Sequence, residues 1–364
     1  MVYFQQYFEQ FHKNIKLKEE PDQKAILEKR ENVIKKLRQG LKTQFQVKEL
    51  TPPSFTHFNQ GSYAMHTGVR PLREGDYDID VGIVFNESTD DHSDPVELKQ
   101  WVLDALGDHT SEVTMKDPCI TVQYFKDDEP LYHVDLAIYV DEGSTTFTEL
   151  SFARGKTGGP AEKKFWEAAE PQKLIERIKN RFSGDDAEQF RRVIKYLKRW
   201  KDINFSSSGN AAPIGIGITV AAYHWFSVSK QMSDMFAGSY TYADITAIKN
   251  ILQQMIANFN STYYNGETVE RLKIELPVEP RADLFEKMTN AQMATLKSKL
   301  EQLLEVLGEA ESEIDPHEAC KKLQRVFGSD FPVPEKSATA TKKRKAVVSS
   351  SSSGSINACY KFDQ

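Results

Sequence analysis

Residues 76–85 read Asp-Tyr-Asp-Ile-Asp-Val-Gly-Ile-Val-Phe, and the pair Gly61-Ser62 precedes them by one short segment. The alternation of residue types and the content of valine and isoleucine predict a β-strand here. Side chains at positions i and i+2 of a strand point to the same face, so Asp78 and Asp80 share one face while the intervening apolar residues bury on the other. Two carboxylates on a mostly buried strand repel each other and lose hydration, a cost that a bound cation offsets. The stretch therefore predicts a metal site on a strand.

A third carboxylate belongs to a second apolar run. Asp135 lies in the middle of residues 132–139, Tyr-His-Val-Asp-Leu-Ala-Ile-Tyr, which also predict a strand. Mg²⁺ takes oxygen ligands and keeps several waters, so three carboxylates plus substrate phosphates complete the shells of two ions, with Mn²⁺ able to substitute. Two such ions suit the transfer of a nucleotide to a hydroxyl group. We expect Asp78 and Asp80 to bridge both ions, and Asp135 to bind the ion beside the attacking hydroxyl and help remove its proton.

Gly61 and Ser62 have the features of a phosphate-binding turn. A glycine lets a triphosphate approach the backbone closely, and exposed N–H groups at the start of a helix favour anions. We expect a short strand over residues 55–58, a helix over residues 62–67 that ends at Gly68, and a hydroxyl of Ser62 that donates to a phosphate oxygen. Alternatively, Ser62 only caps the helix, which is a common role for serine.

The composition is that of a soluble globular protein. Hydrophobic residues make up 39% of the 364 residues and charged residues 27%, which excludes wholesale disorder. A net charge of −6 gives no overall attraction to nucleic acid. Three dispersed cysteines predict reduced thiols in the cytoplasm and exclude a cysteine-based zinc module, whose ligands come in closely spaced pairs. The weakly charged run 211–228 contains a proline and two glycines, so we expect a buried core helix there and no membrane span.

The pattern of elements predicts an α+β fold. We expect a long helix over residues 22–46, a second helix over residues 95–106, and a hairpin made of strands 120–125 and 131–140. A helix between strands followed by antiparallel strands gives a mixed sheet with helices packed on it. After about residue 170 the apolar periodicity becomes helical almost throughout.

Three segments follow from these patterns. The first lobe carries the acids and a long N-terminal helix (1–170), and the second lobe is helical (171–335), with the active site in the cleft between them. The last segment (336–364) contains five consecutive serines and several lysines, and we expect it to be disordered.

A basic helix in the second lobe offers charges for phosphates. Residues 187–202 predict an amphipathic helix, and Lys195 and Lys198 lie on one face of it at positions i and i+3. We expect Lys198, which follows the apolar Leu197, to contact the donor nucleotide across the cleft, together with Lys195. The alternative is a solvated charged face that binds no ligand.

In this order, the motifs resemble those of the bacterial CD-NTases, relatives of cyclic GMP–AMP synthase and oligoadenylate synthase with a polymerase-β-like nucleotidyltransferase fold. The Gly-Ser and Asp-x-Asp motifs are shared by all polymerase-β-like enzymes, whereas the context of the acidic strand and the helical lobe point to this branch. The resemblance covers most of residues 1–333 and rests on residues 60–67, 76–85, 134–137, 194–201 and 327–332.

This resemblance implies the synthesis of cyclic di- or trinucleotide second messengers from nucleoside triphosphates, ATP among them, in CBASS antiphage defence. In such enzymes the acids matching Asp78, Asp80 and Asp135 bind the metals, the serine matching Ser62 holds the donor phosphates, and the lysine matching Lys198 contacts the triphosphate. For the family's second phosphate-binding serine, residues 206–208 are the candidates.

Partners are implied in the same way. A downstream effector would sense the cyclic product, and operon-encoded regulatory or conjugation proteins would be further partners. The zinc module of the animal DNA sensor has no counterpart in this sequence, which argues against activation by DNA through that route.

Two alternatives from other classes remain. The first is an RNA- or tRNA-tailing nucleotidyltransferase, which would be expected to carry a basic RNA-binding extension. The second is a pseudoenzyme that binds nucleotides as a sensor or scaffold, which the loss of one acid would suggest, although all three acids are present.

Overall fold

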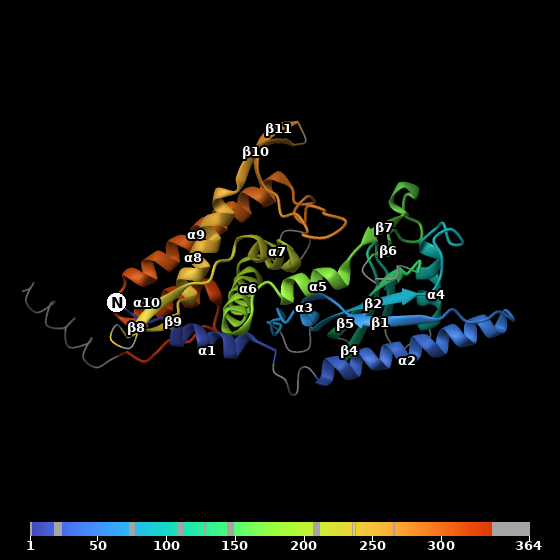
Figure 1. Cartoon of the computed structure of the whole chain (residues 1–364), viewed down its shortest axis with the longest axis horizontal. Coiled ribbons are helices and arrows are strands. Elements are labelled where there is room, and N and C mark those ends of the chain that lie inside the picture. The colour runs from blue at the N-terminus through green and yellow to red at the C-terminus, as the bar shows by residue number, and fades with distance from the viewer. Residues whose placement is uncertain are drawn as a thin grey trace, which may run out of the picture.

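The computed structural model describes residues 2–17, 24–72, 77–107, 112–126, 129–143, 149–206, 212–234, 236, 238–264 and 266–336. It has the predicted α+β fold, with a mixed sheet and its helices at one end of the molecule and a largely helical assembly at the other (Figure 1). Helix α5 (Pro171–Lys179) lies between the two. The predicted disordered tail lies outside the described residues, apart from Lys336.

Seven strands form one mixed sheet. Strands β2 and β5 run parallel at its centre, and every other pairing is antiparallel. The strands predicted at 55–58, 76–85, 120–125 and 131–140 are confirmed to within two residues, whereas β3, β6 and β7 were not predicted. In spatial order the main path is β1 (Phe55–Asn59), β2 (Tyr77–Phe85), β5 (Glu129–Val140), β4 (Ile120–Lys126) and β3 (Glu112–Met115); β6 (Leu150–Ala153) pairs with β5, and β7 (Trp166–Ala169) with β6, after a short 3₁₀ turn at Ala161–Lys163.

One face of the central strands is covered by two helices. Alternate apolar residues of β2 and β5 are buried in a core with α2 (Lys24–Val47) and α4 (Val96–Leu106), which are the predicted helices at 22–46 and 95–106. The residues between them in sequence therefore point to the opposite face, as strand geometry requires. At one end of the strands, that opposite face carries the acids Asp78, Asp80 and Asp135.

A second core joins the helices of the C-terminal half. It contains α6 (Gly184–Asn204), α7 (Gly215–Trp225), α8 (Asp244–Ala257), α9 (Asn290–Ser312) and α10 (Pro316–Phe327). Helix α7 is the buried core helix expected within residues 211–228. The expectation of an almost wholly helical region was wrong in part, because two hairpins interrupt it: β8 (Lys230–Asp234) with β9 (Ser239–Tyr242), and β10 (Phe259–Tyr264) with β11 (Glu267–Leu272).

The first helix packs on this second core. In α1 (Gln5–Ile15) the rings of Phe8 and Phe11 lie 5.1 to 6.0 Å from those of Phe327 and Phe331. The end of α1 lies beside the segment after α3 (Gly61–Ala64), where the backbone N–H of Arg70 donates to the carbonyl of Ile15 at 2.8 Å. Leu17, two residues beyond α1, packs against the first core, so the N-terminal segment contacts both cores. The predicted domain boundaries stay a prediction. The described part of the chain holds no helix that could span a bilayer.

Candidate active site

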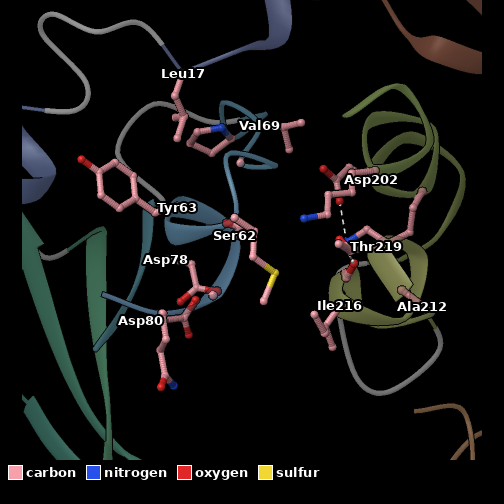
Figure 2. A pocket seen from close by; sticks show the side chains of 18 of the residues that line it. Leu17, Ser62, Tyr63, Val69, Asp78, Asp80, Asp202, Ala212, Ile216 and Thr219 are labelled. Carbon is pink, nitrogen blue, oxygen red and sulfur yellow. Dashed lines mark hydrogen bonds and ion pairs between the residues drawn. The ribbon is translucent and has the colours of Figure 1, made fainter. Parts of the chain in front are cut away.

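A cavity of about 820 Å³ opens between the sheet and the helical core. Figure 2 shows Asp78 and Asp80 on one side of it, with Asp202 and Thr219 facing them from the other. Gly61 and Ser62 line the sheet side, and Lys198 and Lys201 line the helical side. The cavity occupies the position where the sequence placed the active site, between an acid-bearing sheet and a basic helix.

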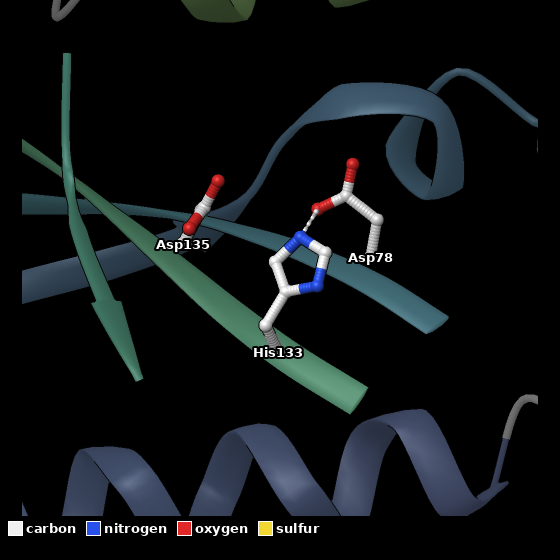
Figure 3. Close-up of side chains that lie close together, drawn as sticks. All are labelled: Asp78, His133 and Asp135. Carbon is white, nitrogen blue, oxygen red and sulfur yellow. Dashed lines mark ion pairs between the residues drawn. The ribbon is translucent and has the colours of Figure 1, made fainter. Parts of the chain in front are cut away.

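The pairing of β2 with β5 brings the acids together. In the parallel register Asp80 lies opposite Asp135, and Asp78 lies opposite His133. One ligand atom each of Asp78, His133 and Asp135 lie within 4.8 Å of one another (Figure 3). Asp135 is not among the residues that line the cavity, but it belongs to this cluster beside Asp78.

Asp80 is the most strongly perturbed of the three acids. Burial, and then the neighbouring carboxylates of Asp78 and Asp135, raise its pKa to about 8. A buried carboxylate with two like charges nearby favours protonation unless a cation neutralises the group. With oxygen donors from three acids converging on one end of a strand pair, the residues fit a divalent cation.

Gly61 allows the close approach of Asp80 to the turn. Its φ is +66°, in the left-handed region that glycine adopts without steric cost, and a Cβ built on it would lie 1.8 Å from Asp80 Oδ2. The backbone N–H of Gln60 also donates to the carbonyl of Asp80 at 3.1 Å. The turn and the acidic strand are therefore one unit.

The helix after this turn is shorter than expected. Helix α3 covers only Gly61–Ala64, and His66, with φ +58°, lies beyond its end, whereas the prediction was a helix over residues 62–67. The N-cap is Gln60, so Ser62 lies inside the helix and does not cap it. Ser62 lines the cavity instead, where its hydroxyl can meet a ligand.

His133 belongs to the site, although the sequence patterns assigned it no role. Its Nε2 lies 3.2 Å from Asp78 Oδ1, and this hydrogen bond raises the pKa of the imidazole against the opposing effect of burial. The sequence held a usable signal, because His133 precedes Asp135 by two residues and must share its strand face.

Thr121 was also missed. It lies opposite Asp135 in the β4–β5 ladder and donates its hydroxyl to Asp135 Oδ1 at 2.5 Å. This bond orients the Asp135 carboxylate. This contact depends on the register between β4 and β5, which the local sequence pattern does not determine.

The basic helix presents one of the two expected lysines to the cavity. Lys198 is buried at the cavity and donates to the carbonyl (3.2 Å) and hydroxyl (3.1 Å) of Thr67, and its pKa is lowered to about 7 by burial and next by Lys201. Lys201 lines the cavity and pairs with Asp202 at 2.7 Å. Lys195 does not line it, so the i, i+3 pair that faces the cavity is Lys198 and Lys201.

Hydroxyl groups lie near the lysines on the helical side. Ser206 lines the cavity, whereas residues 207 and 208 of the predicted serine cluster lie outside the described residues. Thr219 of α7 also lines it, with its hydroxyl donating to the carbonyl of Gly215 at 3.2 Å. Thr219 had no sequence signal, because it lies within the apolar run of α7.

Comparison with known proteins agrees with this geometry. The family model "Cyclic GMP-AMP synthase DncV-like, nucleotidyltransferase domain" matches residues 55–139, which hold the Gly-Ser turn and all three acids. No curated protein sequence matches the chain.

Solved structures extend the likeness to most of the chain. The Vibrio cholerae DncV cyclic AMP-GMP synthase is 18% identical with a TM-score of 0.65, over 91% of this chain and 98% of that one. A complex of DncV with the linear intermediate 5′ pppA(3′,5′)pG is 17% identical with a TM-score of 0.64, over 89% of this chain and 97% of that one. The Bradyrhizobium diazoefficiens CD-NTase CdnG bound to GTP is 14% identical with a TM-score of 0.64, over 93% of this chain and 97% of that one.

The match thus confirms the enzyme class for the segment that carries the acids, and the structures confirm the fold for the rest. Residues 55–139 match the nucleotidyltransferase domain of DncV-like enzymes, in a chain that has the fold of the bacterial CD-NTases.

Proposed function

We propose that this chain makes cyclic di- or trinucleotides from nucleoside triphosphates, ATP among them, as a cytoplasmic signal in bacterial antiphage defence. The observation that carries the proposal is the cavity itself, with clustered acids on one wall and Lys198 and Lys201 on the other. Support comes from the fold shared with a cyclic AMP-GMP synthase, one complex of which holds a linear dinucleotide intermediate. A cavity with acids for cations on one wall and lysines on the other suits substrates that carry several phosphates.

The acids would hold the cations. Asp78, Asp80 and Asp135 would together hold two Mg²⁺ ions, with Mn²⁺ able to substitute. Such ions neutralise the charge of the pyrophosphate that leaves and favour ionisation of the hydroxyl that attacks. The raised pKa of Asp80 supports this assignment, because a cation removes the repulsion that raises it.

The remaining side chains position the reactants. In the reaction a ribose hydroxyl oxygen would form a bond to the α-phosphorus of the donor, the bond from that phosphorus to pyrophosphate would break, and Asp135 would help take up the hydroxyl proton. Thr121 keeps Asp135 in place through its hydrogen bond to Oδ1. Gly61 and Ser62 would contact the donor phosphates from the sheet side, with Lys198 opposite.

Incubation of the purified chain with all four nucleoside triphosphates and Mg²⁺ or Mn²⁺, followed by phosphatase treatment and mass spectrometry, tests the proposal. We expect phosphatase-resistant cyclic species from the wild type and none from the Asp78→Asn/Asp80→Asn double variant, because that variant lacks the shared ligands of both cations. Circular dichroism of the variant controls for folding.

Other outcomes would identify a different protein. Linear extended products would indicate a tailing transferase. Cation-dependent binding of ATP with no product, also in the presence of extract from phage-infected cells as a source of activator, would indicate a nucleotide-binding pseudoenzyme. A confirmed cyclic product would justify a search for the effector that senses it and for operon-encoded regulatory or conjugation partners.

A further inference from the structure

We propose that His133 is itself a metal ligand, and that with Asp78 and Asp135 it forms a cation position that binds Mn²⁺ more tightly than Mg²⁺. The inference rests on the proposed function, because it concerns one of the two cation positions of the same site. It adds a nitrogen donor to a site that the acids alone would make purely of oxygen.

The distances suit a shared ion. Around an octahedral cation with bonds of about 2.1 Å, neighbouring ligand atoms lie about 3 Å apart and opposite ones about 4.2 Å apart. His133 Nε2 lies 3.2 Å from Asp78 Oδ1, which matches two neighbouring ligands. All three ligand atoms lie within 4.8 Å of one another, so shifts of well under an ångström would place them around one ion.

The sheet holds the three side chains in place. Asp78 and His133 are opposite each other in the parallel ladder, and Asp135 follows His133 on the same strand face. The intervening Val134 is fully buried on the other face, in the core with α2 and α4. A rotation of β5 that removed His133 from Asp78 would expose that core, so the strand keeps His133 on the same face as the acids.

The donor set determines which cation is favoured. Imidazole nitrogen suits transition metals, whereas Mg²⁺ demands oxygen ligands and near-ideal octahedral geometry. Mn²⁺ is hard enough for carboxylates and, as a transition metal, accepts imidazole. Asp80 is not part of the cluster with His133, so a second ion held by Asp80 would keep an all-oxygen protein shell. The two cation positions therefore differ in their preference.

A purely structural role for His133, as the hydrogen-bonding partner of Asp78, is the alternative that the test must separate. His133→Gln retains an N–H donor near the position of Nε2 and so can keep the bond to Asp78, but it removes the imidazole. His57→Gln is the matched control: His57 lies on β1 with its Nε2 3.9 Å from Glu31 Oε1, a second histidine–carboxylate pair that is outside the cluster.

The experiment uses the full chain without nucleotide and with Mn²⁺ as the probe. Pulsed electron paramagnetic resonance of the bound ion detects the ¹⁴N nucleus of a coordinated imidazole. We expect that signal in the wild type and in His57→Gln, and its loss in His133→Gln. We also expect His133→Gln to weaken Mn²⁺ binding by about tenfold or more, since even residues that only support a ligand have effects of that size, while Mg²⁺ binding changes far less.

Bound Mn²⁺ that depends on Asp78 but lacks the ¹⁴N signal in the wild type would overturn the proposal and leave the proposed function intact. An equal loss of Mn²⁺ and Mg²⁺ binding in His133→Gln would overturn the stated preference. Failure of the nucleotide assay in the presence of the ¹⁴N signal would instead overturn the proposed function and leave the metal site standing.

Discussion

A single backbone position, Gly61, decides how closely the Gly61-Ser62 turn approaches the acids. Gly61 has φ +66°, and any Cβ there would meet Asp80 Oδ2 at 1.8 Å. The contact links the two motifs that stand 15 or more residues apart in the sequence and explains why the turn requires glycine. A substitution at Gly61 therefore acts on Asp80, and not only on the turn.

We predict that Gly61→Ala loses most of its nucleotidyl transfer and some stability. The left-handed backbone alone costs about 1–2 kcal/mol with a side chain, and the added methyl must also displace the Asp80 carboxylate. Gly158→Ala is the matched control, because Gly158 has φ +73° and open space around its Cβ. Urea unfolding should show a similar backbone cost in both variants, whereas turnover should fall only in Gly61→Ala. Equal turnover in the two variants would contradict the contact with Asp80.

At the scale of elements, the parallel pairing of β2 with β5 builds the site. The local alternation is enough to place Asp78 and Asp80 on one face of their strand and to put Asp135 on a second one. Which residues stand opposite one another depends on register, a long-range property that the local pattern does not contain. For this reason the sequence predicted the acids, while the contact of Asp78 with His133 and that of Asp135 with Thr121 emerged only from the fold.

Long periodic elements were predictable, and short polar ones were not. Helix α2 and strand β2 end within two residues of their predicted ends. The apolar residues of α2 follow the helical period and those of β2 follow the strand period, so each pattern fits only one type of secondary structure. Strands β8 and β9 are largely exposed and polar, so they lack the alternation that marks a strand with a buried face. Strand β6 has only four residues, too few to establish a pattern.

Helix α6 leads to a prediction about its lysines. Lys201 lines the cavity, whereas Lys195 does not. Because a hydrogen bond to a charged group contributes about 1.5–3 kcal/mol, Lys201→Met should weaken binding of a non-hydrolysable ATP analogue by about tenfold or more, as measured by calorimetry. Lys195→Met is the control on the same helix and should bind the analogue like the wild type. A loss of binding in Lys195→Met with none in Lys201→Met would contradict this assignment.

At the scale of the whole molecule, the site depends on two cores that meet at the cavity. The acids stand on the sheet packed by α2 and α4, and Lys198 stands on a helix of the other core. Helix α1 joins the second core although it comes first in the chain, and its C-terminal end contacts the segment after α3. Asp80 and Lys198 thus stand on separate cores, on opposite walls of the cavity.

This arrangement predicts how stability depends on pH without divalent cations. The pKa of Asp80 rises from 3.8 to about 8 on folding. The protonated side chain therefore contributes to the free energy of unfolding fully below about pH 4, and this contribution is lost as the pH rises through 8. The free energy of unfolding should fall across this window by up to about 1.4 kcal/mol per pH unit. Lys198 has the opposite effect above pH 7. Its pKa is lowered from 10.5 to about 7 on folding, so the free energy of unfolding rises between these two pH values.

Asp80→Asn isolates the carboxylate, because the amide has the same shape but does not titrate. Urea unfolding between pH 4 and 8 should give a steeper decline for the wild type than for Asp80→Asn, and the variant should be the more stable protein at pH 8. Adding Mn²⁺ at pH 8 should restore stability to the wild type, because the ion binds the folded, ionised site and not the unfolded chain. Parallel curves for the two proteins would mean that Asp80 is solvated in the folded state, and would remove the electrostatic argument for a cation beside it.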